Sequence, residues 1–579
     1  MKRRPLPQAR RGASFAAWLR HPRAGVKRLA AMHRILTPLL AVLLLATIAA
    51  ARDGIVATEH QLAAGAGADV LRAGGSAVDA AIAAAAAVCV VHASSCGLGG
   101  GGFALVHEAG GRDVALDYRE RAPADAKPER YLVDGKPDPA RTRTGGLAVG
   151  VPGEVAGWVA LHQRFGRLQL ARVLAPAIAL ARDGFVLEQT PHLRREIERT
   201  AALLRGDPGL RGLFLTADGS VPSPEFRVVA TELARTLEAI GRDGARAIYG
   251  GATAAAIASA AQARGGVLTT ADLAAYRPIW RRPLTATLWG RQVVTFPPPG
   301  SGGIVLEIAG ILAHDDLAAL GAGSAATLHL VAGAMAQGFA DRARWYGDPD
   351  FTPVPTDRLL APSRLAALRA RLRSDRVTEP SADVTPDAGT ANISVVDTDG
   401  NAAAMTTTIN TGFGAGILVP GTGIILNNEM DDFAVAPGQA NVYGLVGGVA
   451  NAIAPGKRPQ SSMSPTIVLR AGKPELVVGG SGGPTIISGV LQVLLGVVAQ
   501  GAAVPAAVAA PRIHDQASPP VLAVEPGVAP EARALLTRIG HKVVDMPAIG
   551  AVSAVGLAAD GTPSGCGDSR KDGGVARVP

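Results

Sequence analysis

The chain has little cysteine, few aromatic residues and few charges for its length. Of its 579 residues, three are cysteine, 4% are aromatic and 18% are charged. Three is a small and odd number of cysteines, and no cluster of cysteine and histidine has the spacing of metal ligands. We therefore expect no metal site. The scarcity of aromatic residues means that the core must be built mainly from aliphatic side chains.

The three cysteines lie in different surroundings. Cys89 belongs to a stretch rich in alanine and valine, where we expect it to be a small buried apolar residue. Cys96 and Cys566 lie in loops rich in glycine and serine. They could form a disulfide only if the fold brings them together, which spacing along the chain does not show.

Acidic residues are missing from the first 51 positions, which hold ten lysines and arginines. Subtracting these ten from the formal net charge of +9 leaves −1 for residues 52–579. The body of the protein is thus close to neutral, and its charge gives no reason to expect a nucleic-acid partner.

An apolar run, residues 35–51, follows the basic segment and ends in three alanines. Basic, apolar and small residues in this order predict an export signal cleaved near Ala51, and therefore a periplasmic or secreted protein. The alternative is an uncleaved membrane anchor, but 17 residues that include Pro38 are marginal for spanning a bilayer. Residues 1–31 are interpreted as an upstream extension.

The 528 residues after the leader exceed an ordinary single core, so two lobes or two subunits are expected. Helical patterns dominate the first half, at His60–Ala73, Val78–Val91, Pro152–Phe165, Ala171–Asp183 and Phe226–Arg242. Further helices are predicted at Ile486–Ala499 and Pro530–Ile539. Strand patterns occur at Gly102–His107, Asp113–Tyr118, Gly423–Leu426, Thr466–Arg470 and Leu476–Gly480. This order favours sheets sandwiched between helical layers.

The sharpest break in composition, Ser374–Gly389, is followed by a predicted hairpin of strands Thr390–Val396 and Ala402–Ile409. If the hairpin is symmetric about residue 399, Thr390 faces Thr408, and Asn410 lies diagonally on the same face. A slip of register by one or two residues would break this pairing.

Thr390 is therefore a candidate nucleophile. A threonine hydroxyl needs a base, and a free α-amino group can serve if the Gly389–Thr390 peptide bond is cut. Glycine at position 389 leaves its carbonyl sterically open to attack. The plainer interpretation, an ordinary β-branched strand residue, is the one that the pattern alone favours.

Other candidate motifs are weaker in isolation. The run Gly97–Gly102 precedes a strand instead of opening a helix, so a dinucleotide site is rejected. Arg119 could bind a carboxylate, or could simply pair with a neighbouring acid at the surface. The loop Gly479–Pro484 could form an oxyanion hole or a structural turn. Ser461 and Ser462 offer hydroxyls before a strand.

Taken together, these segments resemble the γ-glutamyltransferase family, also called glutathione hydrolases, from about Gly54 to Arg570. The matching segments are Gly74–Ala81, Leu98–Phe103, Asp117–Glu120, Pro297–Gly303, Tyr346–Asp350, Asn427–Phe433 and Lys457–Pro465. The resemblance implies an α+β fold, a four-layer αββα sandwich of the N-terminal-nucleophile hydrolase type. It also implies self-cleavage into a large subunit, 52–389, and a small catalytic subunit, 390–579, which remain together as a heterodimer.

The resemblance also implies roles for single residues. Thr390 would be the nucleophile of self-cleavage and turnover, Thr408 would orient it, and Gly482 and Gly483 would form the oxyanion hole. The substrate's amino-acid group would be bound by Arg119, Ser461 and Ser462 at its carboxylate and by Asn410, Glu429 and Asp432 at its ammonium. The segment Pro437–Lys457 is similar to the family's lid. Ala391 and Asn392 depart from the family pattern, since many relatives have Thr and His there.

The implied reaction transfers the γ-glutamyl group of glutathione or a similar donor to Thr390. Water, an amino acid or a dipeptide then accepts it, without a metal or organic cofactor. Two alternatives stay open. One is an acylase of the same architecture for glutaryl-type β-lactam side chains, whose substrate lacks the α-amino group. The other is an exported binding protein that is never processed.

Overall fold

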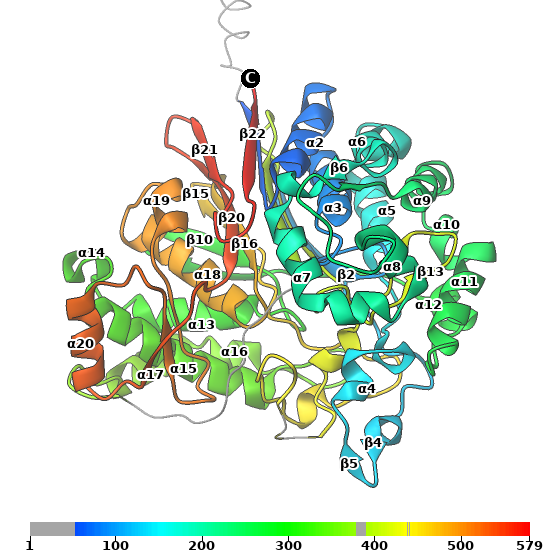
Figure 1. The fold of residues 1–579 in the computed structure, drawn as a ribbon. Coiled ribbons are helices and arrows are strands. Elements are labelled where there is room, and N and C mark those ends of the chain that lie inside the picture. Colours follow the sequence, from blue (N-terminus) through cyan, green and yellow to red (C-terminus); the bar gives the residue numbers. More distant parts are fainter. Residues whose placement is uncertain (1–52, 378–388, 437, 439) are drawn as a thin grey trace, which may run out of the picture. The chain divides into compact units, whose positions relative to one another are not determined.

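Two stacked β-sheets lie between two layers of helices in the computed structural model (Figure 1). The structure describes residues 53–377, 389–436, 438 and 440–579. The predicted export signal and most of the predicted processing segment, 378–388, lie outside the described residues. Among the helices of the described part, none combines the length and apolar character needed to cross a membrane.

The first sheet has seven strands and contains the predicted hairpin. Its strands, in spatial order, are β22 (Gly574–Val578), β1 (Gly54–Thr58), β11 (Thr390–Val396), β12 (Ala402–Thr408), β2 (Gly101–Glu108), β3 (Arg112–Tyr118) and β8 (Ile279–Arg281). All of the neighbouring strands are antiparallel. The two hairpin strands therefore lie in the middle of the sheet, buried along their whole length.

The second sheet has six strands and faces the first. Its order is β21 (Pro563–Cys566), β20 (Ala551–Leu557), β16 (Lys473–Ser481), β15 (Thr466–Arg470), β10 (Arg291–Thr295) and β9 (Leu284–Leu288). Strand β16 contacts β11 and β12 across the interface between the sheets. The loop that follows β16 is thereby brought to the same end of the stack as Thr390.

One helical layer covers the outer face of the seven-stranded sheet (Figure 1). It is built on α2 (Gln61–Arg72), α3 (Ala77–Val91), α5 (Glu154–Phe165), α6 (Leu170–Asp183) and α9 (Thr231–Asp243). Helix α3 packs directly on β11 and β12 and is buried on every side. Its alanines allow this close approach, and a capping box between Ser76 and Asp79 begins it.

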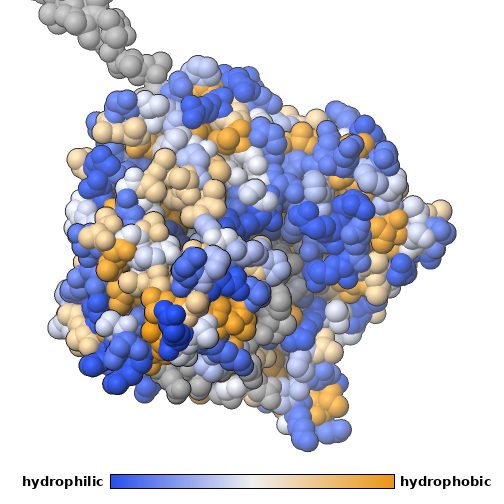
Figure 2. Space-filling model, turned by 60° about the vertical axis from the view of Figure 1, so that its left-hand side comes forward, coloured by the Kyte–Doolittle hydropathy of each residue, from blue (hydrophilic) through white to orange (hydrophobic). Residues whose placement is uncertain are grey.

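The other helical layer covers the six-stranded sheet. Its main helices are α13 (Gly302–Leu312), α15 (Ala325–Trp345) and α18 (Thr485–Leu494). Helix α18 packs on β16, and α13 packs on β10 and on α15. On the face drawn in Figure 2, hydrophobic residues are scattered among hydrophilic ones, as is usual for a folded surface.

Most predicted elements are confirmed within one or two residues, with three corrections. The helix predicted from Phe226 begins only at Thr231, because Arg227–Val228 pairs as a short strand, β7, with β6 (Phe185–Val186). The strand predicted at Leu476 begins already at Lys473. The helix predicted to run to Ala499 is α-helical only to Leu494 and continues as a π-helical turn.

Cys89 is buried, as predicted, but its pairing was not foreseen, and the pairing of Cys96 with Cys566 that the sequence left open does not occur. Cys89 forms a disulfide with Cys96, and Cys566 is free. Cys89 lies near the end of α3, and the turn that follows the helix returns the chain so that the two Cα atoms lie 4.9 Å apart. The turn joins a cysteine from a stretch rich in alanine and valine to one from a loop rich in glycine and serine. The composition around each cysteine therefore did not indicate the disulfide.

Candidate active site

The predicted register of the hairpin is confirmed, because Thr390 pairs with Thr408 across β11 and β12. The Thr390 hydroxyl lies 3.5 Å from Thr408 Oγ1, at the limit of a hydrogen bond. Thr408 Oγ1 donates to the Gly389 carbonyl oxygen at 2.6 Å and accepts from the Asn410 N–H at 2.8 Å. A hydroxyl has one donor and two acceptor positions, so Thr408 uses all three. Its orientation toward Thr390 is thereby fixed.

Gly389 adopts a backbone conformation that favours glycine, with φ of 121°. A Cβ at this position would also lie 2.0 Å from the Asn410 carbonyl oxygen. The chain can therefore pass between Thr408 and Asn410 only because residue 389 has no side chain. This close passage places the Gly389 carbonyl against the Thr408 hydroxyl.

The glycines that were predicted to form an oxyanion hole lie in the loop after β16. Gly482 and Gly483 both have positive φ, 123° and 47°. Within the described residues, neither of their N–H groups donates a hydrogen bond, while the Gly482 carbonyl accepts from the Thr485 N–H at 3.0 Å. Gly482 and Gly389 line one cavity of about 300 Å³. Of the two glycines, Gly482 therefore lines the same cavity as the predicted cleavage point.

The predicted substrate-binding charges meet in the interior. The guanidinium of Arg119 forms ion pairs with Glu429 and Asp432, and it donates to the Gln460 carbonyl oxygen at 3.3 Å. Arg119 is 1% exposed, so the alternative of a surface pair is wrong. Its immediate neighbour Glu120 lies 3.7 Å away as a third acid. Residues separated by more than 300 positions are thus joined in one cluster.

Burial controls the protonation of these acids. It raises the pKa of Glu429 well above its usual range and that of Glu120 to about 7, although the Arg119 cation opposes both shifts. Desolvation therefore favours the protonated form of both carboxyl groups, and a bound cation would favour release of a proton.

Asn410 connects the threonine pair to the predicted lid. The Tyr443 hydroxyl donates to Asn410 Oδ1 at 2.6 Å, and Asn410 Nδ2 donates to the Asn428 carbonyl at 3.0 Å. From the same lid segment, Asn441 Nδ2 donates to Asp432 Oδ1 at 3.2 Å. The described residues of this predicted lid, 438 and 440–457, therefore include contacts to both Asn410, beside the threonine pair, and the charged cluster.

Ser461 and Ser462 lie beside this cluster, together with Arg342, which sequence reasoning missed. Arg342 donates to Ser462 Oγ at 3.2 Å and to Ser301 Oγ at 3.1 Å. Ser461 Oγ accepts from the Met463 N–H at 3.2 Å. Burial lowers the pKa of Arg342 only to about 10, so it remains a cation. In the sequence Arg342 is one arginine of a long helix, and nothing local marks it.

A second pair that the sequence did not reveal contacts the predicted nucleophile, Thr390. Lys571 Nζ donates to the Thr390 carbonyl oxygen at 2.6 Å and to Glu59 Oε2 at 2.9 Å. Glu59 Oε1 accepts from the Asn392 N–H at 3.1 Å. Burial raises the pKa of Glu59, and the cation of Lys571 opposes this shift. Both side chains come from loops at the same end of the seven-stranded sheet.

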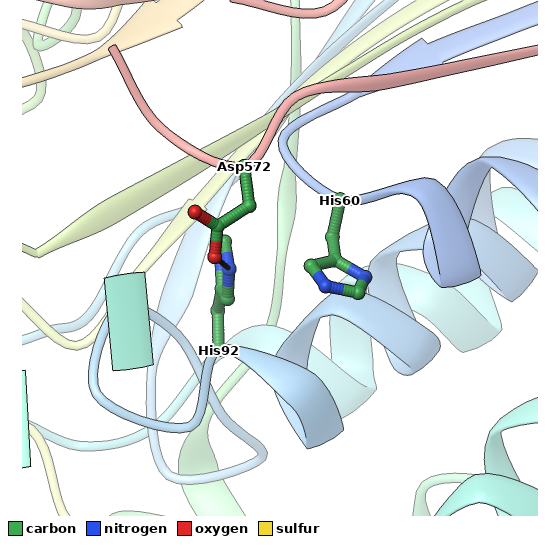
Figure 3. A group of neighbouring side chains, drawn as sticks. All are labelled: His60, His92 and Asp572. Atoms are coloured by element: carbon green, nitrogen blue, oxygen red, sulfur yellow. Dashed lines mark hydrogen bonds and ion pairs between the residues drawn. The ribbon is translucent and has the colours of Figure 1, made fainter. Parts of the chain in front are cut away.

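A histidine cluster includes Asp572, the residue that follows Lys571 in the chain (Figure 3). The ligand atoms of His60, His92 and Asp572 lie within 4.8 Å of one another. Both nitrogens of His60 are already engaged, Nδ1 by the Leu62 N–H and Nε2 by the Gln189 carbonyl oxygen at 2.7 Å. Burial lowers the pKa of His92 to about 4, so it is neutral. The cluster is therefore a hydrogen-bonded support, because a cation could bind only by breaking the His60 contacts.

Comparison with known proteins gives a consistent result. The family model described as Gamma-glutamyltranspeptidase matches residues 63–578. The chain belongs to this family. It is 40% identical to the glutathione hydrolase proenzyme of Escherichia coli strain K12 over 90% of this chain and 91% of that protein. It is also 38% identical to the Acylase ACY 1 proenzyme of Pseudomonas sp. strain SE83, over 90% and 92%.

Solved structures support the predicted architecture of this γ-glutamyltranspeptidase family member. The chain is similar to the crystal structure of a cephalosporin acylase from Bacillus halodurans, with a TM-score of 0.80 and 29% identity over 91% of this chain and 96% of that one. The αββα sandwich of the N-terminal-nucleophile hydrolases is thus confirmed, and the chain is a γ-glutamyltransferase-type enzyme. Glutathione hydrolases and acylases both occur among its relatives, so family membership leaves the substrate open.

Proposed function

We propose that the chain is an exported, self-processing γ-glutamyltransferase and glutathione hydrolase. The observation that carries this proposal is one arrangement: the Thr390–Thr408 hydroxyl pair lies under the same lid as a buried cation flanked by two acids. A nucleophile beside sites for both a carboxylate and an ammonium fits a donor with a free amino-acid end. The export signal and the resulting periplasmic or secreted location are part of the proposal.

Self-cleavage would begin with attack of Thr390 Oγ1 on the carbonyl carbon of Gly389. The hydrogen bond from Thr408 would stabilise the negative charge that develops on the carbonyl oxygen. The bond between this carbon and the Thr390 nitrogen then breaks, and the nitrogen takes up the hydroxyl proton. Water hydrolyses the resulting ester, which leaves a carboxylate on Gly389 and a free α-amino group on Thr390.

In turnover the freed amine of Thr390 would accept the proton of its own hydroxyl as Oγ1 attacks the γ-amide carbon of the donor. The N–H groups of Gly482 and Gly483 would stabilise the oxyanion. The amide C–N bond breaks, and the leaving amine takes the proton. Water or an amino acid or dipeptide then attacks the γ-glutamyl ester and restores the hydroxyl. The catalytic groups in these steps all belong to the chain itself.

The charged cluster would bind the glutamyl end by exchanging partners. The donor carboxylate would replace an acid at Arg119 and accept hydrogen bonds from Ser461 and Ser462. The donor ammonium would bind Glu429, Asp432 and the side-chain oxygen of Asn410. Each new ion pair replaces one that exists within the protein, so binding leaves no buried charge unpaired.

A glutaryl-type acylase is the second candidate, because the relatives include proteins named as acylases. A glutaryl amide has no α-ammonium, and it would leave Glu429 and Asp432 without a cationic partner. We therefore expect kcat/KM for γ-glutamyl-p-nitroanilide to exceed that for glutaryl-p-nitroanilide by at least about 100-fold. In the variant Glu429→Gln this ratio should fall toward one. A wild-type preference for the glutaryl compound would favour the acylase.

The decisive experiment is expression followed by gel electrophoresis and N-terminal sequencing. We expect two fragments, the smaller of which begins Thr-Ala-Asn-Ile-Ser at Thr390, and the larger of which begins near Arg52 if the leader is cleaved. The two fragments should co-elute as a heterodimer under native conditions. Thr390→Ala should stay uncut and inactive. A single uncut wild-type band would instead support a binding protein, and any other start would overturn the nucleophile assignment.

A further inference from the structure

We propose that Lys571 is a positioning residue for the nucleophile, which holds the Thr390 carbonyl and keeps the freed α-amino group unprotonated near neutral pH. The inference rests on the proposed function, because cleavage must first free that amino group. Its basis is the direct contact of Lys571 Nζ with the Thr390 carbonyl oxygen at 2.6 Å. Lys571 is 9% exposed, so water screens its charge only weakly.

The position of this cation relative to the amine follows from covalent geometry. The nitrogen and carbonyl oxygen of one residue are separated only by Cα and the carbonyl carbon, so Lys571 lies within a few ångströms of both. A positive charge at such a distance disfavours protonation of the amine. The amine would then be available as the base that the Thr390 hydroxyl requires.

Glu59 holds the lysine in place without cancelling its effect on the amine. Its Oε2 accepts from Lys571 at 2.9 Å, while its Oε1 accepts from the N–H of Asn392, two residues beyond the nucleophile. Of the two charges, the cation of Lys571 is the one that contacts the Thr390 carbonyl directly.

The histidine cluster of Figure 3 fixes the backbone beside Lys571. Asp572 accepts from the backbone N–H of His192 at 2.8 Å and lies 3.2 Å from His92 Nε2. On the other side, the Lys571 N–H donates to the Asp568 carbonyl oxygen at 3.2 Å. The segment is thus anchored at Asp572 and at the backbone of Lys571 itself, and the long lysine side chain has a fixed origin.

Other titratable groups line the cavity that contains Gly389 and Lys571, namely His192, Arg195, Glu196, His514 and Arg570. Burial lowers the pKa of His192 well below its usual range and that of His514 to about 4, so both are neutral. Arg570 pairs with Glu525, and Glu196 pairs with Arg199. Arg195 lies 3.9 Å from Asp572 and is largely exposed. Of the described titratable groups that line this cavity, Lys571 is the one that contacts Thr390.

The test is the pH dependence of kcat/KM in the cleaved enzyme. In Lys571→Met the acidic limb of the kcat/KM profile should move to higher pH by about one unit or more. The reason is that the α-amino group loses a neighbouring cation that disfavours its protonation. Activity at pH 6 should therefore fall at least tenfold, while activity at pH 9 should change much less. Lys571→Arg should keep the wild-type limb. The exposed Lys473→Met is the matched control, and its profile should be unchanged.

Glu59→Gln provides an independent and opposite readout. It leaves Lys571 charged without its acid, so the acidic limb should move to lower pH. A limb that stays in place in cleaved Lys571→Met or Glu59→Gln would overturn the inference. If neither Lys571→Met nor Glu59→Gln cleaves itself while Lys571→Arg cleaves normally, the Lys571–Glu59 pair has a structural role only. That result would also overturn the inference. Failure of the proposed function would be distinct, because wild-type protein would then not begin a fragment at Thr390.

Discussion

The hydroxyl of Thr408 donates a 2.6 Å hydrogen bond to the carbonyl oxygen of Gly389, the atom on which self-cleavage would develop negative charge. Removing one such donor costs about 10²- to 10³-fold in rate. We therefore expect Thr408→Val to slow self-cleavage by this factor, and Thr408→Ser to stay within about tenfold of wild type. A time course of the small fragment on gels measures both rates. Cleavage of Thr408→Val at the wild-type rate would contradict the assignment.

The predicted lid contains Tyr443, whose hydroxyl donates to Asn410 Oδ1 at 2.6 Å. A hydrogen bond of this kind contributes about 1 kcal/mol. Tyr443→Phe should therefore loosen the closed lid and raise KM for a γ-glutamyl amide about fivefold, with little change in thermal stability. Steady-state kinetics and a thermal melt separate the two effects. An unchanged KM would show that the lid does not need this contact.

The hairpin was predictable because its signals are local. A strand has a period of two, and the turn Asp397–Asn401 is closed by Asp397, which accepts from the N–H groups of Asp399 and Asn401 at 3.0 and 2.9 Å. Turn and period together determine the register, so Thr390 could be placed opposite Thr408 from sequence alone.

The charged groups around the hairpin were not predictable in the same way. Arg119 meets Asp432 across 313 positions, and Lys571 meets Thr390 across 181. Arg342 and Lys571 belong to no recognisable motif in the sequence, and only the folded sheets bring them to the site. The roles assigned to Arg119 and Asp432 came from resemblance to a family, whereas Lys571 required the structure.

The Cys89–Cys96 disulfide leads to a prediction about thiol content. Protein from an oxidising compartment, denatured without reductant, should show one reactive thiol per chain, from Cys566, and three after reduction. A loop of this length is expected to contribute about 2 kcal/mol, so Cys96→Ser should lower the melting temperature by a few degrees. Cys566→Ser is the control and should leave it unchanged. Three thiols before reduction would contradict the pairing.

The buried carboxyl group of Glu154 should make stability depend on pH. Burial raises its pKa to about 8, although the hydrogen bond that it accepts from the Thr407 hydroxyl opposes this shift. Between its unfolded and folded pKa values, Glu154 is protonated in the folded state and ionised in the unfolded state. Its contribution to the free energy of unfolding therefore falls as pH rises from about 4.5 to 8, by at most about 1.4 kcal/mol per pH unit. The melting temperature of Glu154→Gln relative to that of wild type should therefore rise by several degrees when the pH is raised from 5 to 8. The exposed Glu188→Gln should show no such gain. Equal differences at both pH values for Glu154→Gln would refute the raised pKa.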